Sequence, residues 1–478
     1  MRDAAPAALT GLADLSVADL GSGFRAGDFD PVDALEAALA RIERFDPLVN
    51  AFVYRNDPDS RAQAAAAAAR YRDGRPRGPL DGVPLSVKDL TPVAGWPIRR
   101  GSAALSPTEP AAEDAPCIAR LRAAGAVFVG KTATPESGSR IVTRSAVHGV
   151  TRNPWALERT PGGSSGGAAA ALALGMGTLA TGTDGAGSIR IPAAFCNLWG
   201  LKPGFGRVPS WPPSHFMPHS VTGPMARRIA DLAALTAVMA EPEPRDPFAW
   251  PVPLAPAAAD GAAAGLRVAL SRDLGTGHLP SAEIIAALEA VAAALATAGA
   301  DMVEDSPVWP VPPAEPFEVF WTTSYAGFLD LYPTEMAARM DPLLHTIAER
   351  GRAVDTRAYH RALNQRLALT ATAHAFLTRY DAVLGPSVIG PAFDLEAEAP
   401  PGETPDDWAW CPYAYIFNMT GQPALAVPAA FDPAGLPLGV QLAARQGRDE
   451  TLLRLGAVVE EALSCMARRP SMLRDCSA

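Results

Sequence analysis

The chain has 478 residues, of which 48% are hydrophobic and 19% charged, and its formal net charge is −10 at pH 7. This composition is typical of a globular protein and excludes a disordered chain. The negative charge disfavours a protein built mainly to bind nucleic acid or an anionic membrane.

The first residues lack a basic segment followed by an apolar core, so we expect no secretory signal. The alanine-rich runs are too short and interrupted to span a bilayer. The five cysteines are dispersed and form no C-x-x-C pair, which indicates free thiols in a reducing compartment. We therefore expect a cytoplasmic protein with reduced Cys117, Cys196, Cys411, Cys465 and Cys476.

Predicted helices and strands alternate along the N-terminal half. Asp30 is the predicted N-cap of a helix that begins at Pro31 and that Asp46-Pro47 ends. An amphipathic helix opened by Pro224 is expected from Gly223 onward. Between them we expect a strand over 51–55, a helix over 57–73, a strand over 83–87, a helix over 113–126, a strand over 126–131, a helix over 168–174, a strand over 179–181 and a short segment over 189–192 that continues the alternation.

The C-terminal half continues the alternation after a Pro- and Ala-rich stretch. Residues 241–265 fit either an interdomain linker or a long surface connection inside one domain. Strands alternating with helices favour an α/β fold, and a late hairpin adds antiparallel pairing. The expected elements are strands over 266–270 and 302–304, a helix over 282–298, a mostly helical region over 315–376, a strand over 382–384, a hairpin of 424–431 with 439–444, and a helix over about 450–463.

Lys88 ends an apolar strand, VPLSVKD, where an ammonium group is costly to bury. One interpretation is an ion pair with Asp89. The other is a desolvated lysine with a lowered pKa that acts as a base. Two serine-containing turns downstream favour the base.

These two turns are rich in glycine: GGSSGG over 162–167 and GTDGAGS over 182–188. Glycine accumulates where the backbone needs a positive φ or where another group approaches it closely. The amides of 185–187 come directly before Ser188, which suits an oxyanion hole with the nucleophile at its end. His148, His215 and His219 lie far from both serines in sequence, and we expect surface or core-edge roles for them.

Long motifs now connect these features to a known family. VPLSVKDL, GKTATPES, TRNPW, TPGGSSGGAAAALALG, GTDGAGSIRIPAAFCNLWGLKP, GPMARRIADL and FNMTGQPALAVP occur in this order. Together they resemble the amidase signature family, from about Pro31 to the last helix. The resemblance implies one α/β domain over 1–478, with a mixed, mostly parallel sheet flanked by helices. A helical insertion at about 305–380 would form the substrate pocket.

The resemblance also implies a catalytic Ser–cis-Ser–Lys triad. Ser188 falls on the nucleophile, Ser164 on the serine that follows a cis peptide bond, and Lys88 on the base. Lys88 would take a proton from Ser164 while Ser164 takes one from Ser188. The amides expected to hold the oxyanion are those of Gly185, Ala186, Gly187 and Ser188.

Supporting roles are expected for residues beside the triad. Ser165 adjoins Ser164, and Asp184 with Arg190 would form a structural pair that fixes the nucleophile turn.

Substrate contacts are less clearly marked in the sequence. Gly138 lies near the acyl pocket by the resemblance, and Trp321 and Tyr325 are candidate wall residues. Ordinary helix packing is the alternative for each aromatic residue. The segment Tyr413–Asn418 is a further candidate lining.

The implied function is hydrolysis of the C–N bond of linear, aryl or oligo-amides, with carbamates or esters as further substrates. It implies a small-molecule amide ligand, no cofactor, no metal, no nucleic acid, no membrane, and a monomer or homodimer. Ala186, Ala133 and Gly204 depart from the common motifs. They weaken the assignment to the glutamine-hydrolysing subunits of tRNA amidotransferases, which remain the alternative.

A nucleotide-binding module is a second alternative. Residues 21–26 fit G-x-G-x-x-A, but no predicted strand precedes them, and neither glycine-rich turn has the Lys-Ser/Thr ending of a P-loop.

Overall fold

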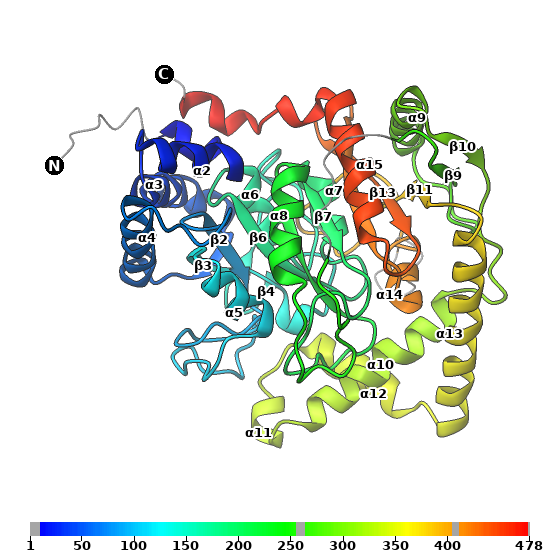
Figure 1. Ribbon diagram of the computed structural model, residues 1–478. Helices are drawn as coiled ribbons and strands as arrows, with labels where there is room; N and C mark the ends of the chain where they lie inside the picture. Colours follow the sequence, from blue (N-terminus) through cyan, green and yellow to red (C-terminus); the bar gives the residue numbers. More distant parts are fainter. Residues whose placement is uncertain (1–9, 255–262, 404–410, 477–478) are drawn as a thin grey trace.

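The protein is built around one mixed β-sheet (Figure 1). The computed structural model describes residues 10–254, 263–403 and 411–476, and these contribute eleven strands to the sheet. In spatial order the strands are β1 (Phe52–Tyr54), β3 (Val127–Thr132), β2 (Pro84–Lys88), β6 (Leu179–Asp184), β8 (Val221–Ala226), β7 (Trp199–Lys202), β12 (Ala424–Phe431), β13 (Pro437–Ala444), β11 (Ala382–Pro386), β9 (Arg267–Leu270) and β10 (Asp301–Glu304). A separate pair is formed by β4 (Arg144–Ser145) and β5 (Gly149–Val150).

Helices cover both faces of this sheet (Figure 1). Val127 and Val129 of β3 join the apolar cluster of one face, and Phe128 joins that of the other, as strand alternation requires. The first face carries α3 (Pro31–Val49), α6 (Gly166–Ala173) and α7 (Arg190–Cys196), and the second carries α5 (Pro116–Ala123), α8 (Ile229–Met239), α9 (Ala282–Thr297) and α15 (Asp449–Ala462).

The remaining helices lie at the margins of the sheet. In Figure 1 the helices from α10 to α13 gather at one end of the molecule, beyond the strands. The margin helices are α2 (Val17–Ala26), α4 (Asp57–Arg72), α10 (Ala314–Asp330), α11 (Thr334–Ala337), α12 (Pro342–Arg352), α13 (Thr356–Leu377) and α14 (Ile416–Thr420), and the 3₁₀ turns are η1 (Thr10–Asp14), η2 (Glu136–Gly138), η3 (Ser464–Ala467) and η4 (Ser471–Cys476).

The expected α/β fold with a mixed sheet flanked by helices is confirmed. Parallel pairs join β2 to β3 and β6 at one end and β9 to β10 and β11 at the other. Between these two blocks the described strands pair antiparallel, because β8 runs against both its neighbours and β12–β13 is a hairpin. Across the described sheet, antiparallel pairs outnumber parallel ones, so the parallel share is smaller than the resemblance implied.

The predicted stop at Asp46-Pro47 is wrong, because α3 continues to Val49. Proline removes one backbone donor, and one lost hydrogen bond near the end of a nineteen-residue helix does not stop it. Asn50 ends the helix in the left-handed region at φ 55°, where its N–H donates to Asp46 O.

The predicted helix from Gly223 is also wrong in its first residues. They form β8, and the helix α8 begins only at Ile229. A residue before proline disfavours the helical conformation. A Cβ at Gly223 would also lie 2.2 Å from Leu201 O, so close packing on β7 fixes this segment as a strand.

The other predicted elements lie within a few residues of those observed. The short segment over 189–192 belongs to α7, and the helical region over 315–376 divides into α10 to α13. Part of the stretch over 241–265 packs on the body of the domain, since Trp250 Nε1 donates to Phe205 O at 2.9 Å. This favours a connection inside one domain over a linker. Residues 255–262 lie outside the described residues.

Within the described ranges, no helix is both long and apolar enough to cross a membrane. Cys117, Cys196, Cys411 and Cys465 are buried free thiols. The side chain of Cys476 is outside the described part.

Candidate active site

Two neighbouring parallel strands bring the first site residues together. Val87 of β2 lies opposite Thr181 of β6, so both strands end at the same edge of the sheet. Lys88 is the last residue of β2, and Thr183 and Asp184 end β6. Ligands of α/β proteins bind outside such carboxyl ends.

Lys88 is fully buried among hydroxyl groups. Its Nζ lies 2.7 Å from Ser164 Oγ, 2.8 Å from Ser165 Oγ and 2.9 Å from Thr183 Oγ1. Burial lowers the pKa of Lys88 well below its ordinary value, against a smaller opposing effect of the Asp184 charge. The amine is therefore biased towards its neutral form, which has a lone pair that can accept a proton.

The ion pair between Lys88 and Asp89 is absent. Asp89 instead pairs with Lys131 Nζ at 3.0 Å, and both side chains are buried. Successive residues at the end of a strand point to opposite sides, which separates Lys88 from Asp89. The structural alternative for Lys88 is therefore wrong.

The GGSSGG turn is held in close contact with neighbouring backbone. A Cβ at Gly163 would lie 2.7 Å from the backbone of Val142, and one at Gly167 would lie 2.4 Å from Ala133 N. The Gly163–Ser164 peptide is cis. Ser165 precedes α6, and its N–H donates to Ser188 O at 3.1 Å, which joins the two serine turns.

Asp184 anchors the turn that carries Ser188. Its carboxylate accepts from the N–H groups of Gly187 at 2.8 Å and Ile189 at 3.1 Å. The N–H of Gly187 is therefore not available to an oxyanion, which corrects the expectation for this residue. By contrast, no hydrogen bond among the described residues engages the N–H groups of Ala186 and Ser188.

Asp184 and Arg190 form a fully buried, two-point ion pair, with Oδ1–Nη2 and Oδ2–Nε distances of 3.0 Å. Burial alone would raise the pKa of Asp184, but the Arg190 guanidinium holds it below its ordinary value. Arg190 also donates to Gln441 Oε1 at 2.8 Å and Asn418 Oδ1 at 2.6 Å. The sequence did not identify Asn418 and Gln441 as partners of this pair, because they lie more than 220 residues further along the chain.

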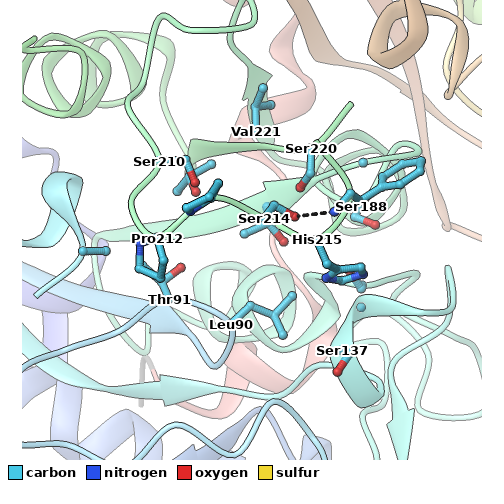
Figure 2. Close-up of a pocket in the computed structure, with 18 of the residues that line it drawn as sticks. Leu90, Thr91, Ser137, Ser188, Ser210, Pro212, Ser214, His215, Ser220 and Val221 are labelled. Atoms are coloured by element: carbon cyan, nitrogen blue, oxygen red, sulfur yellow. Dashed lines mark hydrogen bonds between the residues drawn. The ribbon is translucent and has the colours of Figure 1, made fainter. Parts of the chain in front are cut away.

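Ser164 and Ser188 line the same cavity, of about 120 Å³, which we call the first cavity. Thr183, Gly185 and Ala186 complete its floor. Figure 2 shows Leu90, Ser137 and His215 around the same hollow as Ser188, under a loop that carries Ser210, Pro212, Ser214 and Ser220. Phe216 N donates to Ser214 Oγ at 3.1 Å within this loop, the bond drawn dashed in Figure 2.

The candidate substrate residues Gly138, Trp321 and Tyr325 all line the first cavity. A Cβ at Gly138 would lie 3.4 Å from Ser164 Oγ, so its lack of a side chain leaves room beside the serine. Trp321 and Tyr325 come from α10, and the hydroxyl of Tyr325 donates to Ser137 O at 3.1 Å.

A second cavity, of about 70 Å³, adjoins the first and shares Gly138, Ala186, Ser188 and Trp321 with it. Ser188 therefore lies where the two cavities meet. The rest of the second cavity is lined by Ser139, Arg140, Ile141, Glu318, Thr322, Leu343, Ile347, Arg350 and Glu398.

The three histidines have no bond to either serine among the described residues. His215 lines the first cavity, which the sequence did not predict, with its ring 4.9 Å from that of Tyr325 and 4.6 Å from that of Phe328. Burial lowers the pKa of His215 and of His219 to about 3, so both are neutral near pH 7. His148 is half-buried and lines neither cavity.

The segment Tyr413–Asn418 does not line either cavity, which corrects that expectation. The Tyr413 hydroxyl donates to His278 O at 2.8 Å, and Tyr415 stacks on Phe317. Asn418 supports the Asp184 turn by donating to Asp184 O at 2.8 Å. No three His, Cys, Asp or Glu side chains in the described part are grouped to hold a metal ion.

Comparison with known proteins is consistent with this geometry. The model of the Amidase family matches residues 33–453. An acylamidase of Rhodococcus erythropolis is 35% identical over 473 residues, covering 96% of this chain and 97% of the relative. One of the subunits of the glutamyl-tRNA(Gln) amidotransferase of a Roseiflexus species is 34% identical over 499 aligned positions, covering 97% and 99%. The crystal structure of a bacterial aryl acylamidase of the amidase signature family superposes with a TM-score of 0.88 at 27% identity, covering 97% of this chain and 98% of that one.

Proposed function

Because this chain belongs to the amidase family and is an amide-hydrolysing enzyme, we propose that Ser188 is its nucleophile and that Ser164 and Lys88 relay its proton. The observation that carries this proposal is the buried Lys88 amine, 2.7 Å from Ser164 Oγ at the wall of the cavity that Ser188 also lines. The substrate is a small-molecule amide, and we infer linear, aryl or oligo-amides as its class, with carbamates and esters as further substrates.

The contacts of Lys88 suit a neutral amine. Such an amine has two N–H bonds and one lone pair. It can donate to Ser165 and Thr183 and accept from the hydroxyl of Ser164. Ser165 and Thr183 are therefore positioning residues that orient the lone pair towards Ser164.

The relay supplies protons where the reaction needs them. Lys88 takes the proton of Ser164 while Ser164 takes that of Ser188, and the Ser188 oxygen attacks the carbonyl carbon. The tetrahedral intermediate then breaks its C–N bond, and the amine leaves with a proton returned from Lys88 through Ser164. Water attacks the resulting ester by the same relay, which releases the acid and restores Ser188.

The oxyanion is held by backbone N–H groups of the Ser188 turn. We assign the amides of Gly185, Ala186 and Ser188 to this role, since all three residues line the first cavity. Gly187 contributes by shape instead. Its φ is 101°, and a Cβ there would lie 2.6 Å from Ala414 Cβ.

The helical insertion at about 305–380 is proposed to form the substrate pocket. Trp321 and Tyr325 of α10 line the first cavity, and Leu343 and Ile347 of α12 line the second. For the whole protein we propose a cytoplasmic monomer or homodimer, which the buried free thiols favour.

A glutamine-hydrolysing amidotransferase subunit is the second candidate, favoured by the 34% identical amidotransferase relative. The two candidates differ in what the lone chain hydrolyses. An independent amidase cleaves anilides without a partner, whereas a glutaminase subunit prefers glutamine and depends on its complex.

The test is steady-state hydrolysis of N-butyryl-4-nitroaniline and of glutamine by the purified chain. We expect the anilide to be cleaved and Ser188→Ala to lower kcat/KM by at least about 10⁴-fold, since the nucleophile carries every step. Ser86→Ala is the matched control, because this buried hydroxyl on the same strand as Lys88 has no hydrogen-bond partner in the described part. Full activity of the Ser188→Ala variant, or cleavage of glutamine alone, would contradict the proposal.

A further inference from the structure

Arg100 brings an uncompensated positive charge to the wall of the first cavity. This half-buried residue lines the cavity together with Ser164 and Ser188. None of the residues that line the cavity is acidic. Among the described residues the guanidinium of Arg100 has neither an ion pair nor a hydrogen bond.

The neighbouring histidine does not alter this charge balance. After burial, the Arg100 charge is the second cause that lowers the pKa of His215, so the guanidinium and the imidazole lie close together. His215 is neutral near pH 7, because its pKa is about 3. Arg100 is therefore the charged group that a ligand in the first cavity meets.

The second cavity has the opposite character, because its charges are paired. Arg140 lies 2.8 Å from Asp341 and 2.9 Å from Glu398, and Arg350 lies 2.6 Å from Glu318. Trp321, Ile141, Leu343 and Ile347 give the cavity apolar walls. An uncharged, apolar group fits this side of Ser188.

The proton relay determines which half of the substrate occupies which cavity. Ser164 lines the first cavity and not the second. The departing amine must receive its proton from Ser164, so the amine half lies in the first cavity. The acyl half then lies in the second cavity, beyond Ser188 and Ala186.

We propose that the enzyme selects amides with an apolar acyl group and a carboxylate on the amine half, such as N-acylated amino acids and aminobenzoates. Arg100 binds the carboxylate, since a planar guanidinium matches two carboxylate oxygens. This inference rests on the proposed function, because the orientation of the substrate follows from the Ser164 relay.

The test compares two substrates of nearly equal shape, N-butyryl-4-aminobenzoate and N-butyryl-4-aminobenzamide. We expect the enzyme to favour the carboxylate in kcat/KM by about 10- to 100-fold, the usual effect of a charge-assisted hydrogen bond in a sheltered site. The chemical bias runs the other way, since the carboxamide withdraws more electron density and makes the amine a better leaving group. The preference is expected to fall as salt is added.

Arg100→Gln is expected to bring the ratio of the two kcat/KM values close to one, and Arg100→Lys to keep part of it. Arg99→Gln is the matched control, because it removes the same charge one residue away from a side chain that does not line the cavity. The ratio in this control is expected to match that of the unchanged enzyme.

A binding measurement separates this inference from catalysis. In the Ser188→Ala variant we expect 4-aminobenzoate to bind at least about 10-fold more tightly than 4-aminobenzamide, and the added change Arg100→Gln to remove the difference. Hydrolysis of both substrates at equal rates would overturn the inference and leave the proposed function standing. An Arg100-dependent preference for the anilide of succinic acid would also overturn it, because the carboxylate would then lie on the acyl half. Failure to hydrolyse either substrate or any neutral anilide would overturn the proposed function itself.

Discussion

At the scale of single residues, the chemistry depends on an amine kept away from water. Lys88 has no exposed surface, and its neighbours are hydroxyls rather than carboxylates. A carboxylate partner would stabilise the ammonium form and raise the pKa of Lys88. Asp89 is instead neutralised by Lys131, and Asp184 by Arg190, which leaves the Lys88 amine free to act as a base.

This arrangement predicts a characteristic pH profile. A base works in its neutral form, so kcat/KM should rise with pH through the lowered pKa of Lys88 and reach a plateau above it. Lys88→Met should lower kcat/KM by about 10²- to 10⁴-fold at the plateau. The measurement is kcat/KM for a neutral anilide across the pH range in which the fold is stable.

A second buried lysine supplies the control for this profile. Burial lowers the pKa of Lys202 to about 7, so Lys202 titrates in a similar range. It donates to Pro203 O and lines neither cavity. The rise of activity with pH should therefore persist in Lys202→Met, and a flat profile in the unchanged enzyme would contradict the role of Lys88.

The Asp184–Arg190 pair predicts a large loss of stability when one partner is neutralised. Asp184→Asn leaves the buried Arg190 charge uncompensated, so the free energy of unfolding should fall by about 3–5 kcal/mol. The exposed pair of Arg352 with Asp330 is the control, and Asp330→Asn should cost about 0–1 kcal/mol. Urea unfolding of both variants at pH 7 measures the difference, and equal losses would contradict this account.

At the scale of elements, two helices each contain a glycine, with opposite consequences. Gly167 in α6 faces the backbone of Ala133 and Ala51, where a Cβ would lie 2.4 Å from a nitrogen and 2.7 Å from an oxygen. Gly327 in α10 has open space around its would-be Cβ. The first glycine lets the Ser165 turn approach the strand edge, whereas the second has no packing role.

Alanine at the two positions should therefore change stability in opposite directions. Gly167→Ala should lower the free energy of unfolding by about 1–3 kcal/mol, because backbone atoms must move. Gly327→Ala should raise it by about 0.5–1 kcal/mol, because alanine restricts the unfolded chain and favours the helix. Thermal unfolding of the two variants checks the signs, and a stabilised Gly167→Ala variant would be the contrary result.

Elements also show which parts of the fold local sequence could predict. Alternating patterns placed most helices and strands within a few residues, because apolar spacing reflects which face is buried. The strand β8 was predicted as helix, since its pairing with β6 and β7 overrides its local spacing. The N–H of Gly187 was assigned to the oxyanion, because the sequence does not show the direction in which a turn points each amide.

At the scale of the whole molecule, the chain ends help to hold the N-terminal helices. Leu473 of η4 is buried in the same apolar cluster as Leu35 and Phe45 of α3. The two segments are more than 400 residues apart in the chain, and Figure 1 shows them side by side. No local pattern could have predicted this contact.

Leu473→Ala should accordingly lower the free energy of unfolding by about 2–4 kcal/mol, because it leaves a cavity in that cluster. Leu331, which is 75% exposed, gives the matched control, and its alanine variant should stay within about 0.5 kcal/mol. Denaturant unfolding with both variants would contradict the account if the two changes were equal.

The same scale explains what could be learned about the site. Lys88, Ser164 and Ser188 could be predicted because each lies in a distinctive local motif. Arg100 and His215 could not, because only the folded chain brings them to the cavity beside these serines. Likewise, the partners of Arg190 come from α14 and β13, near the far end of the chain.

The central claim is that Ser188 carries the acyl group, and one measurement tests it most directly. The enzyme is mixed with 4-nitrophenyl butyrate, quenched in acid during turnover, digested and examined by mass spectrometry. The account predicts a butyryl ester on Ser188, which is absent when the Ser188→Ala variant is treated in the same way. A butyryl group on Ser164 or on another residue, with Ser188 unmodified, would contradict it.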